Sequence, residues 1–179
     1  PLAKVGTCCF TDTTVAGVAV TAGRTGYTGE DGFELACKNA DAPALWQAII
    51  DAGVQPCGLG SRDSLRLESR LPLYGNALDA TTSPLEAGPG WAGTLARPWA
   101  QAGGDFLGRS ALVAQKAAGL RRSLTGFRID ERATARHGYA VVDRSRPEGE
   151  QVIGTVTSGG PGISVPGAIG LAYLPPLYG

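Results

Sequence analysis

The chain has 179 residues, with 16 basic and 16 acidic side chains, so its formal net charge at neutral pH is zero. This balance excludes a broad basic field of the kind that attracts nucleic acid or an anionic membrane, and we expect neither as a partner. Hydrophobic residues make up 43% of the sequence, which is enough to build a folded core. No apolar run of 18 residues occurs, so no membrane-spanning helix is predicted.

The spacing of the cysteines matches neither a metal-binding motif nor a disulfide framework. None belongs to a CxxC pair, and the chain has a single histidine, so no metal site is predicted. Their small number and irregular spacing fit reduced thiols of a cytoplasmic protein better than a disulfide scaffold. The four are Cys8, Cys9, Cys37 and Cys57.

The first part of the chain predicts a hairpin. Residues 13–22 are β-branched and apolar with a period near two, which predicts one strand. Residues 33–37 alternate in the same way and predict a second strand. The glycine-rich residues 23–32 would form a long, structured loop between them.

Two helices follow. Asp41 is a plausible N-cap with Pro43 in the first turn, and Gly53 would end this helix as a C-cap. A second helix is predicted from about residue 60 to about residue 70. The order strand–strand–helix–helix indicates an α+β fold rather than parallel βαβ units.

The remainder of the chain predicts a second structural unit. Residues 84–104 are rich in Gly, Pro and Ala, which indicates a domain boundary or crossover, and residues 107–118 predict a short helix. Four strands separated by turns then suggest a small antiparallel barrel. These predicted strands span residues 123–129, 139–143, 151–157 and 168–174.

The segment RTGYTGEDGFE, residues 24–34, carries the most chemical information. It lacks the GxxxxGK[ST] pattern, and no helix follows its last glycine directly, so a phosphate loop is a poor interpretation. The plainest interpretation is a glycine-rich hairpin loop. The functional one rests on Tyr27 and Glu34, because an aromatic ring can stack on a flat heterocycle. The carboxylate can then accept two hydrogen bonds from a 2-aminopyrimidinone edge, as in pterins or guanine.

Three further side chains allow two interpretations each. Arg62 and Arg66 are four residues apart on the second predicted helix and would repel each other by a few tenths of a kcal/mol. They form either a solvated face with ion pairs to Asp63 or a site for a substrate carboxylate, which suits the arginine fork. His137 is either a structural residue of a turn or a general base.

Six segments, in the right order, resemble the aminomethyltransferase family of folate-binding proteins, which includes the glycine cleavage T protein. The first two of them are specific, and the others are shared with related folate domains. A KGCYxGQ motif, which marks the tRNA-modifying branch, is absent from the sequence. The six are RTGYTGEDGFEL (24–35), CGLGSRDSLRLESRLPLYGNALD (57–79), SPLEAGPGW (83–91), DFLGRSAL (105–112), RHGYAVV (136–142) and IGTVTSGG (153–160).

The resemblance implies a three-domain fold around a central folate, of which this chain would be a part. Residues 1–90 would be the later part of the middle, ferredoxin-like α+β domain. Residues 91–120 would be a crossover with a short helix, and residues 121–179 an incomplete C-terminal antiparallel β-barrel domain. The missing N-terminal part would hold the family's catalytic aspartate.

The resemblance also assigns ligand contacts residue by residue. The tyrosine and glutamate that contact the pterin correspond to Tyr27 and Glu34, and the folate-site arginine corresponds to Arg62 rather than Arg66. No catalytic residue is assigned, because the matching aspartate lies outside this chain. The sequence departs from the family pattern at two places: it has PGISV at residues 161–165, and it lacks a lysine-rich run in residues 91–104. These differences leave open how the protein binds a carrier protein.

The implied activity is transfer of a one-carbon unit to tetrahydrofolate. An aminomethyl group on the lipoyl arm of the carrier H protein would pass to tetrahydrofolate, with release of ammonia. The expected location is the cytoplasm, or the mitochondrial matrix in a eukaryote. The alternatives are a folate-binding module without transfer activity, a folate-dependent demethylase of the same family, and a purely structural fragment.

Overall fold

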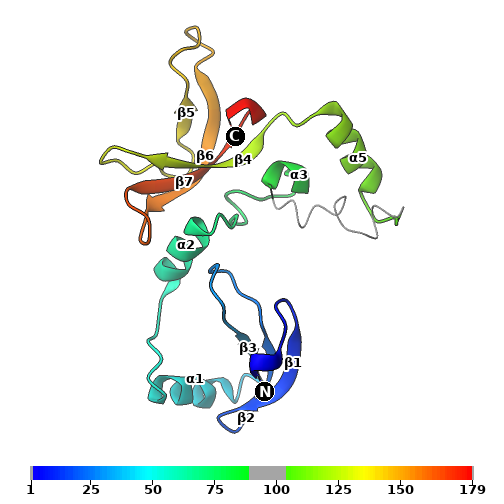
Figure 1. Cartoon of the computed structure of the whole chain (residues 1–179), viewed down its shortest axis with the longest axis vertical. Coiled ribbons are helices and arrows are strands. Elements are labelled where there is room, and N and C mark those ends of the chain that lie inside the picture. Colours follow the sequence, from blue (N-terminus) through cyan, green and yellow to red (C-terminus); the bar gives the residue numbers. More distant parts are fainter. Residues whose placement is uncertain (1, 89–103, 179) are drawn as a thin grey trace. The chain divides into compact units, whose positions relative to one another are not determined.

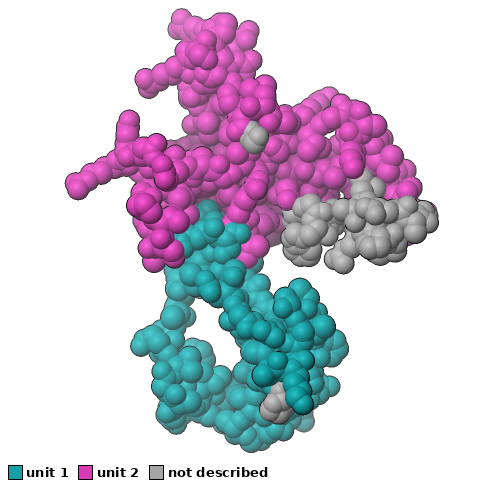
Figure 2. Space-filling view, in the orientation of Figure 1, with its two compact units in different colours: residues 1–69 teal, residues 70–179 magenta. Residues whose placement is uncertain are grey.

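The structure, a computed structural model, describes residues 2–88 and 104–178 (Figure 1). It divides into two compact units, residues 1–69 and residues 70–179, which Figure 2 shows in separate colours. Each unit combines helices with an antiparallel sheet, which confirms the predicted α+β class. The predicted boundary at residue 90 and the first part of the predicted crossover lie outside the described residues. The division into three segments therefore stays a prediction.

The first unit contains a three-stranded antiparallel sheet in the order β1-β2-β3. A short 3-10 turn at Leu2–Lys4 precedes β1 (Phe10–Val15), β2 (Val18–Gly23) and β3 (Glu34–Ala36). The predicted hairpin, in which the glycine-rich loop joins two paired strands, is confirmed. Its strands are β2 and β3, because Gly23 pairs with Glu34 and Thr21 with Ala36.

The prediction of one strand over residues 13–22 is wrong. Val15 pairs with Val18, so a two-residue turn splits this segment into β1 and β2. Ala16 and Gly17 form the turn with φ of 49° and 83°. Positive φ at both central residues is typical of the tight hairpin turns that match the strand twist. The apolar alternation continues on both sides of so short a turn, which is why it read as a single strand.

Both helices of the first unit are confirmed. Helix α1 (Ala42–Asp51) has Asp41 at its N-cap, although the Asp41 side chain makes no capping hydrogen bond. The helix ends at Asp51 with Ala52 as its C-cap, and Gly53 follows with a φ of 87°. Helix α2 (Leu59–Glu68) has Gly58 as its N-cap and Ser69 as its C-cap. The core of this unit consists of Val20, Ala22 and Leu45, with partly buried neighbours around them.

The second unit contains a four-stranded antiparallel sheet in the order β4-β7-β6-β5 (Figure 1). All four strands were predicted, β4 and β7 at their observed bounds and β5 within one residue at each end. The largest difference is the end of β6, which continues to Pro161 instead of ending at residue 157. Strand β7 is central, and six of its seven residues are buried. Within the described residues the sheet stays open, with β4 and β5 at its edges. The strands are β4 (Ser123–Ile129), β5 (Ala140–Val142), β6 (Val152–Pro161) and β7 (Ala168–Leu174).

Among the described residues of the second unit, two helices and a closing turn accompany this sheet: α3 (Pro84–Ala87), α5 (Arg109–Ala118) and a 3-10 turn at Pro176–Tyr178. The predicted helix over residues 107–118 corresponds to α5. No helix of the described residues is both long enough and apolar enough to cross a membrane.

Glu86 organises the start of α3. It forms a capping box, in which the Ser83 backbone N–H donates to Glu86 Oε2 at 3.0 Å and the Glu86 N–H donates to Ser83 Oγ at 3.3 Å. Arg122 Nε donates to the other carboxylate oxygen at 3.0 Å. Burial raises the pKa of Glu86, but the hydrogen bonds from Ser83 and Arg122 outweigh it and hold the pKa below its usual range.

A depressed pKa makes the contribution of Glu86 to stability depend on pH. The ionised carboxylate stabilises the fold fully above the pKa of an unfolded glutamate, about 4.3. This contribution is lost as the pH falls through the lower folded-state pKa. We expect Glu86→Gln to lower the free energy of unfolding by about 1 kcal/mol at pH 7. The difference from the unchanged chain should shrink as the pH falls from about 5 to about 3.

Urea unfolding at a series of pH values measures this difference. Glu148→Gln is the matched control, because Glu148 is exposed in the turn between β5 and β6. A deficit of Glu86→Gln that is constant from pH 7 to pH 3, or one equal to that of the control, contradicts the assignment.

Candidate functional site

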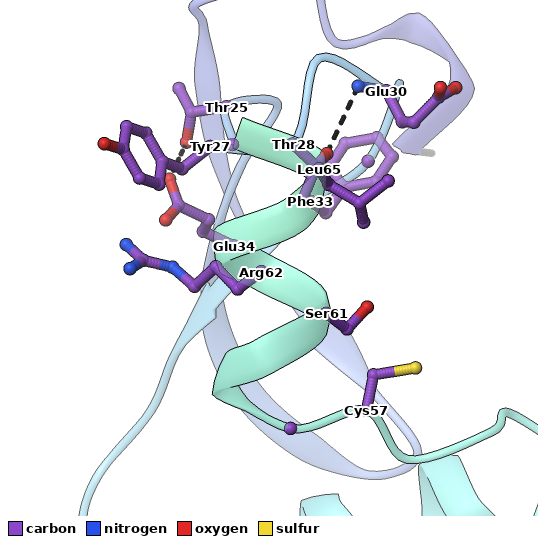
Figure 3. Close-up of a pocket in the computed structure, with 13 residues that line it drawn as sticks. Thr25, Tyr27, Thr28, Glu30, Phe33, Glu34, Cys57, Ser61, Arg62 and Leu65 are labelled. Atoms are coloured by element: carbon purple, nitrogen blue, oxygen red, sulfur yellow. Dashed lines mark hydrogen bonds between the residues drawn. The ribbon is translucent and has the colours of Figure 1, made fainter. Parts of the chain in front are cut away.

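A cavity of about 360 Å³ lies in the first unit (Figure 3). One wall is the loop between β2 and β3 together with the first residue of β3, and the other is one face of α2 with the residues just before it. The residues from this second wall are spaced i, i+3, i+4 and i+7, which places them on one helix face. They are Gly58, Ser61, Arg62 and Leu65, and Cys57 precedes them; the loop wall comprises Thr25, Gly26, Tyr27, Thr28, Glu30, Gly32, Phe33 and Glu34.

The three residues that the resemblance assigns to folate, Tyr27, Glu34 and Arg62, all line this cavity. Figure 3 shows their side chains projecting to the same side. The Arg62 guanidinium carbon lies 4.6 Å from the centroid of the Tyr27 ring. An exposed cation–π contact of this kind is worth about 0.5–1 kcal/mol. A ligand that offers either group a stronger contact can therefore displace it at small cost.

Thr25 holds the Glu34 carboxylate. Its hydroxyl donates a short hydrogen bond to Glu34 Oε2 (Figure 3). This bond fixes the carboxylate at the cavity wall while the side chain stays exposed to a ligand. Thr25 was not among the predicted site residues. The signal that finds it is the strand register: Gly23 pairs with Glu34, so Thr25 lies two residues beyond the end of β2, beside Glu34.

The two arginines of α2 have different surroundings. Arg62 is exposed and lines the cavity, whereas Arg66 is 2% exposed and does not. Arg66 Nε donates to Asp63 Oδ1 at 2.7 Å, within the same helix. The ion-pair interpretation thus describes Arg66, and of the two only Arg62 can meet a ligand in this cavity.

The cavity loop is tied down at two points. Arg24 donates from Nε and a terminal nitrogen to the two carboxylate oxygens of Asp31, at 2.8 and 2.7 Å. These bonds hold the pKa of Asp31 below its usual range. At the other point Ser69 Oγ, just after α2, donates to the Thr28 carbonyl at 2.8 Å. Loop and helix are thereby held as the two walls of one cavity.

The close approach of loop and helix requires a glycine at position 29. Gly29 has a φ of 78°, and a Cβ added there would lie 1.9 Å from Ser69 Oγ. We expect Gly29→Ala to lower the free energy of unfolding by about 1–3 kcal/mol, because it adds backbone strain to a steric clash. Denaturant unfolding measures the loss.

Gly32→Ala is the matched control in the same loop, since a Cβ there meets no heavy atom within 4 Å. Removal of the clashing hydroxymethyl group in the double variant Gly29→Ala, Ser69→Gly should restore part of the loss. Equal stability of the two single variants would show that loop and helix do not approach as closely as described.

The other side chains considered from the sequence are His137 and the four cysteines. His137 is in the second unit, where its Nδ1 lies 3.1 Å from the Thr157 carbonyl oxygen. All four cysteines are free thiols. Within residues 2–88 and 104–178, no group of three or more His, Cys, Asp or Glu side chains could hold a metal ion.

Comparison with known families matches both units. The family model of the GCVT N-terminal domain matches residues 2–97. The model of the glycine cleavage T-protein C-terminal barrel domain matches residues 122–178. Together they span most of the chain in the order that the sequence motifs predict.

Individual relatives agree with these models. The aminomethyltransferases of Rubrobacter xylanophilus and Synechococcus elongatus are 46% and 47% identical over 175 residues, which is 98% of this chain and 44% of each relative. The crystal structure of glycine cleavage system aminomethyltransferase T from Bartonella henselae matches with a TM-score of 0.84 and 32% identity. That match covers 98% of this chain and 46% of the Bartonella chain, so the chain spans less than half the length of these relatives. The chain belongs to the glycine cleavage T-protein family.

Proposed function

We propose that the protein carrying this chain is a tetrahydrofolate-dependent aminomethyltransferase of the glycine cleavage system. It transfers the one-carbon unit from the aminomethyl-lipoyl carrier H protein to tetrahydrofolate and releases ammonia. The observation that carries the proposal is the convergence of Tyr27, Glu34 and Arg62 on one cavity. The relatives named aminomethyltransferase, which match 98% of this chain, support it.

The donor set around Glu34 fits a pterin. The 2-amino-4-oxo edge of a pterin presents two adjacent N–H groups, and a carboxylate accepts both. Hydrogen bonds to a charged group contribute about 1.5–3 kcal/mol each. Thr25 donates to one oxygen of Glu34 and so restricts the orientation of the carboxylate before a ligand arrives. The Tyr27 ring, half-buried in the same wall, offers a face for the flat heterocycle.

Arg62 fits the opposite end of the same ligand. Folates end in a glutamate, and the arginine fork matches a carboxylate with two parallel hydrogen bonds. In this structure the guanidinium covers the Tyr27 ring instead. Replacing the contact of Arg62 with Tyr27 by a contact with the ligand's carboxylate is favourable, because a charge-assisted hydrogen bond is stronger than an exposed cation–π contact.

The chemistry itself needs little from these residues beyond position. Tetrahydrofolate supplies the nitrogen that accepts the one-carbon unit. Tyr27, Glu34 and Arg62 would hold it in one orientation, which makes transfer a proximity effect. We assign no catalytic residue within this chain. The proposal retains residues 1–90 as part of the folate-binding domain, residues 91–120 as the crossover and residues 121–179 as the barrel domain.

The proposed partner and location follow from the same activity. The partner is the lipoyl carrier H protein, which would present the aminomethyl group. The location is the cytoplasm, or the mitochondrial matrix in a eukaryote, and the four free thiols are compatible with either reducing compartment.

The two α2 arginines provide a paired test. In the full-length protein, Arg62→Ala should weaken tetrahydrofolate binding by about 1.5–3 kcal/mol, the scale of a charge-assisted hydrogen bond, and should change the melting temperature little. Arg66→Ala should do the reverse, because it removes a buried side chain and its ion pair with Asp63. Calorimetric titration and melting curves of both variants measure the two effects.

Loss of affinity in Arg66→Ala but not in Arg62→Ala would place the folate arginine one helical turn away. No change of affinity in either variant would remove α2 from the folate site. The transfer reaction is tested separately by ammonia release from aminomethylated H protein. Tetrahydrofolate binding without tetrahydrofolate-dependent ammonia release would identify a folate-binding module instead.

A further inference from the structure

A second cavity, of about 320 Å³, lies wholly within the second unit, apart from the folate site. Nitrogen-bearing side chains gather around it: Arg121, Arg122, His137 and Asn76. Among the described residues that line it, none carries a carboxylate. The chain as a whole has zero net charge, so this local excess of positive charge is not a by-product of a basic composition. We propose that the cavity binds a small organic carboxylate.

Arg122 forms a fixed part of the wall. Its Nε donates to Glu86 at 3.0 Å, a terminal nitrogen lies 3.4 Å from Thr82 Oγ1, and its guanidinium carbon lies 4.4 Å from the centroid of the Tyr173 ring. These three contacts fix the orientation of the guanidinium, so a ligand does not have to order this side chain when it binds. Its charge is already shared with Glu86, so a second cation must supply most of the attraction.

Arg121 is that second cation. It is exposed, and within the described part of the chain it has no hydrogen-bond or ion-pair partner. An arginine carries five N–H donors in a planar fork, which suits a carboxylate. A ligand that binds Arg121 therefore displaces no protein contact.

Two other polar side chains, His137 and Asn76, line the cavity. The carbonyl of Thr157 can only accept a hydrogen bond, so His137 Nδ1 carries the proton of their 3.1 Å contact. This contact fixes the plane of the imidazole ring. Asn76 lies in the turn of residues 75–77, between the bridge partners Tyr74 and Leu78. It precedes Ala77, whose carbonyl accepts a 2.7 Å hydrogen bond from the Tyr173 hydroxyl. Both polar groups are thus attached to well-anchored backbone.

The apolar part of the lining explains why an organic anion fits better than an inorganic one. The side chains of Ile153, Val156 and Pro175 belong to this part, and they offer no hydrogen bonds. Pockets that combine an apolar floor with a few polar groups are typical of small-molecule sites, and they start at about 300 Å³. A short aliphatic stem can cover these residues while its carboxylate meets Arg121.

Calorimetric titration of the 179-residue chain with glutarate at low ionic strength tests the proposal. Saturable binding is expected, and Arg121→Gln should weaken it about tenfold, since it removes the cation without removing a protein contact. Asn76→Asp, which places a carboxylate in the cavity wall, should weaken it at least as much. Arg144→Gln, the same charge change at an exposed site outside the cavity, should leave it unchanged.

Four results would overturn the proposal. One is the absence of saturable glutarate binding, and the second is equal affinity of Arg121→Gln and the unchanged chain. The third is binding of the neutral analogue glutaramide as tightly as glutarate. Much tighter binding of an oligoglutamate peptide than of glutarate would also contradict a small-molecule site, because it would identify a surface for an acidic protein segment.

Discussion

The candidate site depends on one constraint, the close approach of the β2–β3 loop to the end of α2. The Ser69 hydroxyl reaches the Thr28 carbonyl only because Gly29 has no side chain in the space between them. The ion pair of Arg24 with Asp31 closes the same loop on itself. Without these ties, the aromatic ring on the loop and the carboxylate at the start of β3 would have no fixed relation to the arginine on the helix. The cavity thus results from how a glycine-rich loop is pinned, not from the loop's composition alone.

Much of the fold could be predicted from local patterns. Strands β4 and β7 were predicted at their observed bounds, because each is a run of alternating or continuous apolar residues between clear turn signals. Helix α1 followed from a proline in its first turn and a glycine just after its end. The split of residues 13–22 into two strands could not be predicted in the same way. Its turn contains an alanine with positive φ, a conformation that alanine rarely adopts and that only the pairing of two strands enforces.

The site was predicted at the level of residue types but not of contacts. Tyr27, Glu34 and Arg62 were identified through resemblance to a family, and the structure places all three around one cavity. Their role as folate ligands remains a proposal. The contribution of Thr25 was missed, because a hydrogen bond between residues nine positions apart depends on the register of a hairpin. Helix periodicity alone puts Arg62 and Arg66 on one face, so before the structure only the resemblance distinguished them. The structure adds the physical difference, because Arg66 is buried and Arg62 lines the cavity.

The central claim is that the Glu34 carboxylate recognises the 2-amino-4-oxo edge of a pterin. The most direct test compares the binding free energy of a tetrahydropterin with that of its 2-deamino analogue, in the unchanged chain and in Glu34→Gln. Glu30→Gln is the control, because it makes the same charge change within the same cavity. The unchanged chain and the control should prefer the 2-amino compound by about 1.5–3 kcal/mol, and Glu34→Gln should lose most of this preference. An undiminished preference in Glu34→Gln would contradict the account.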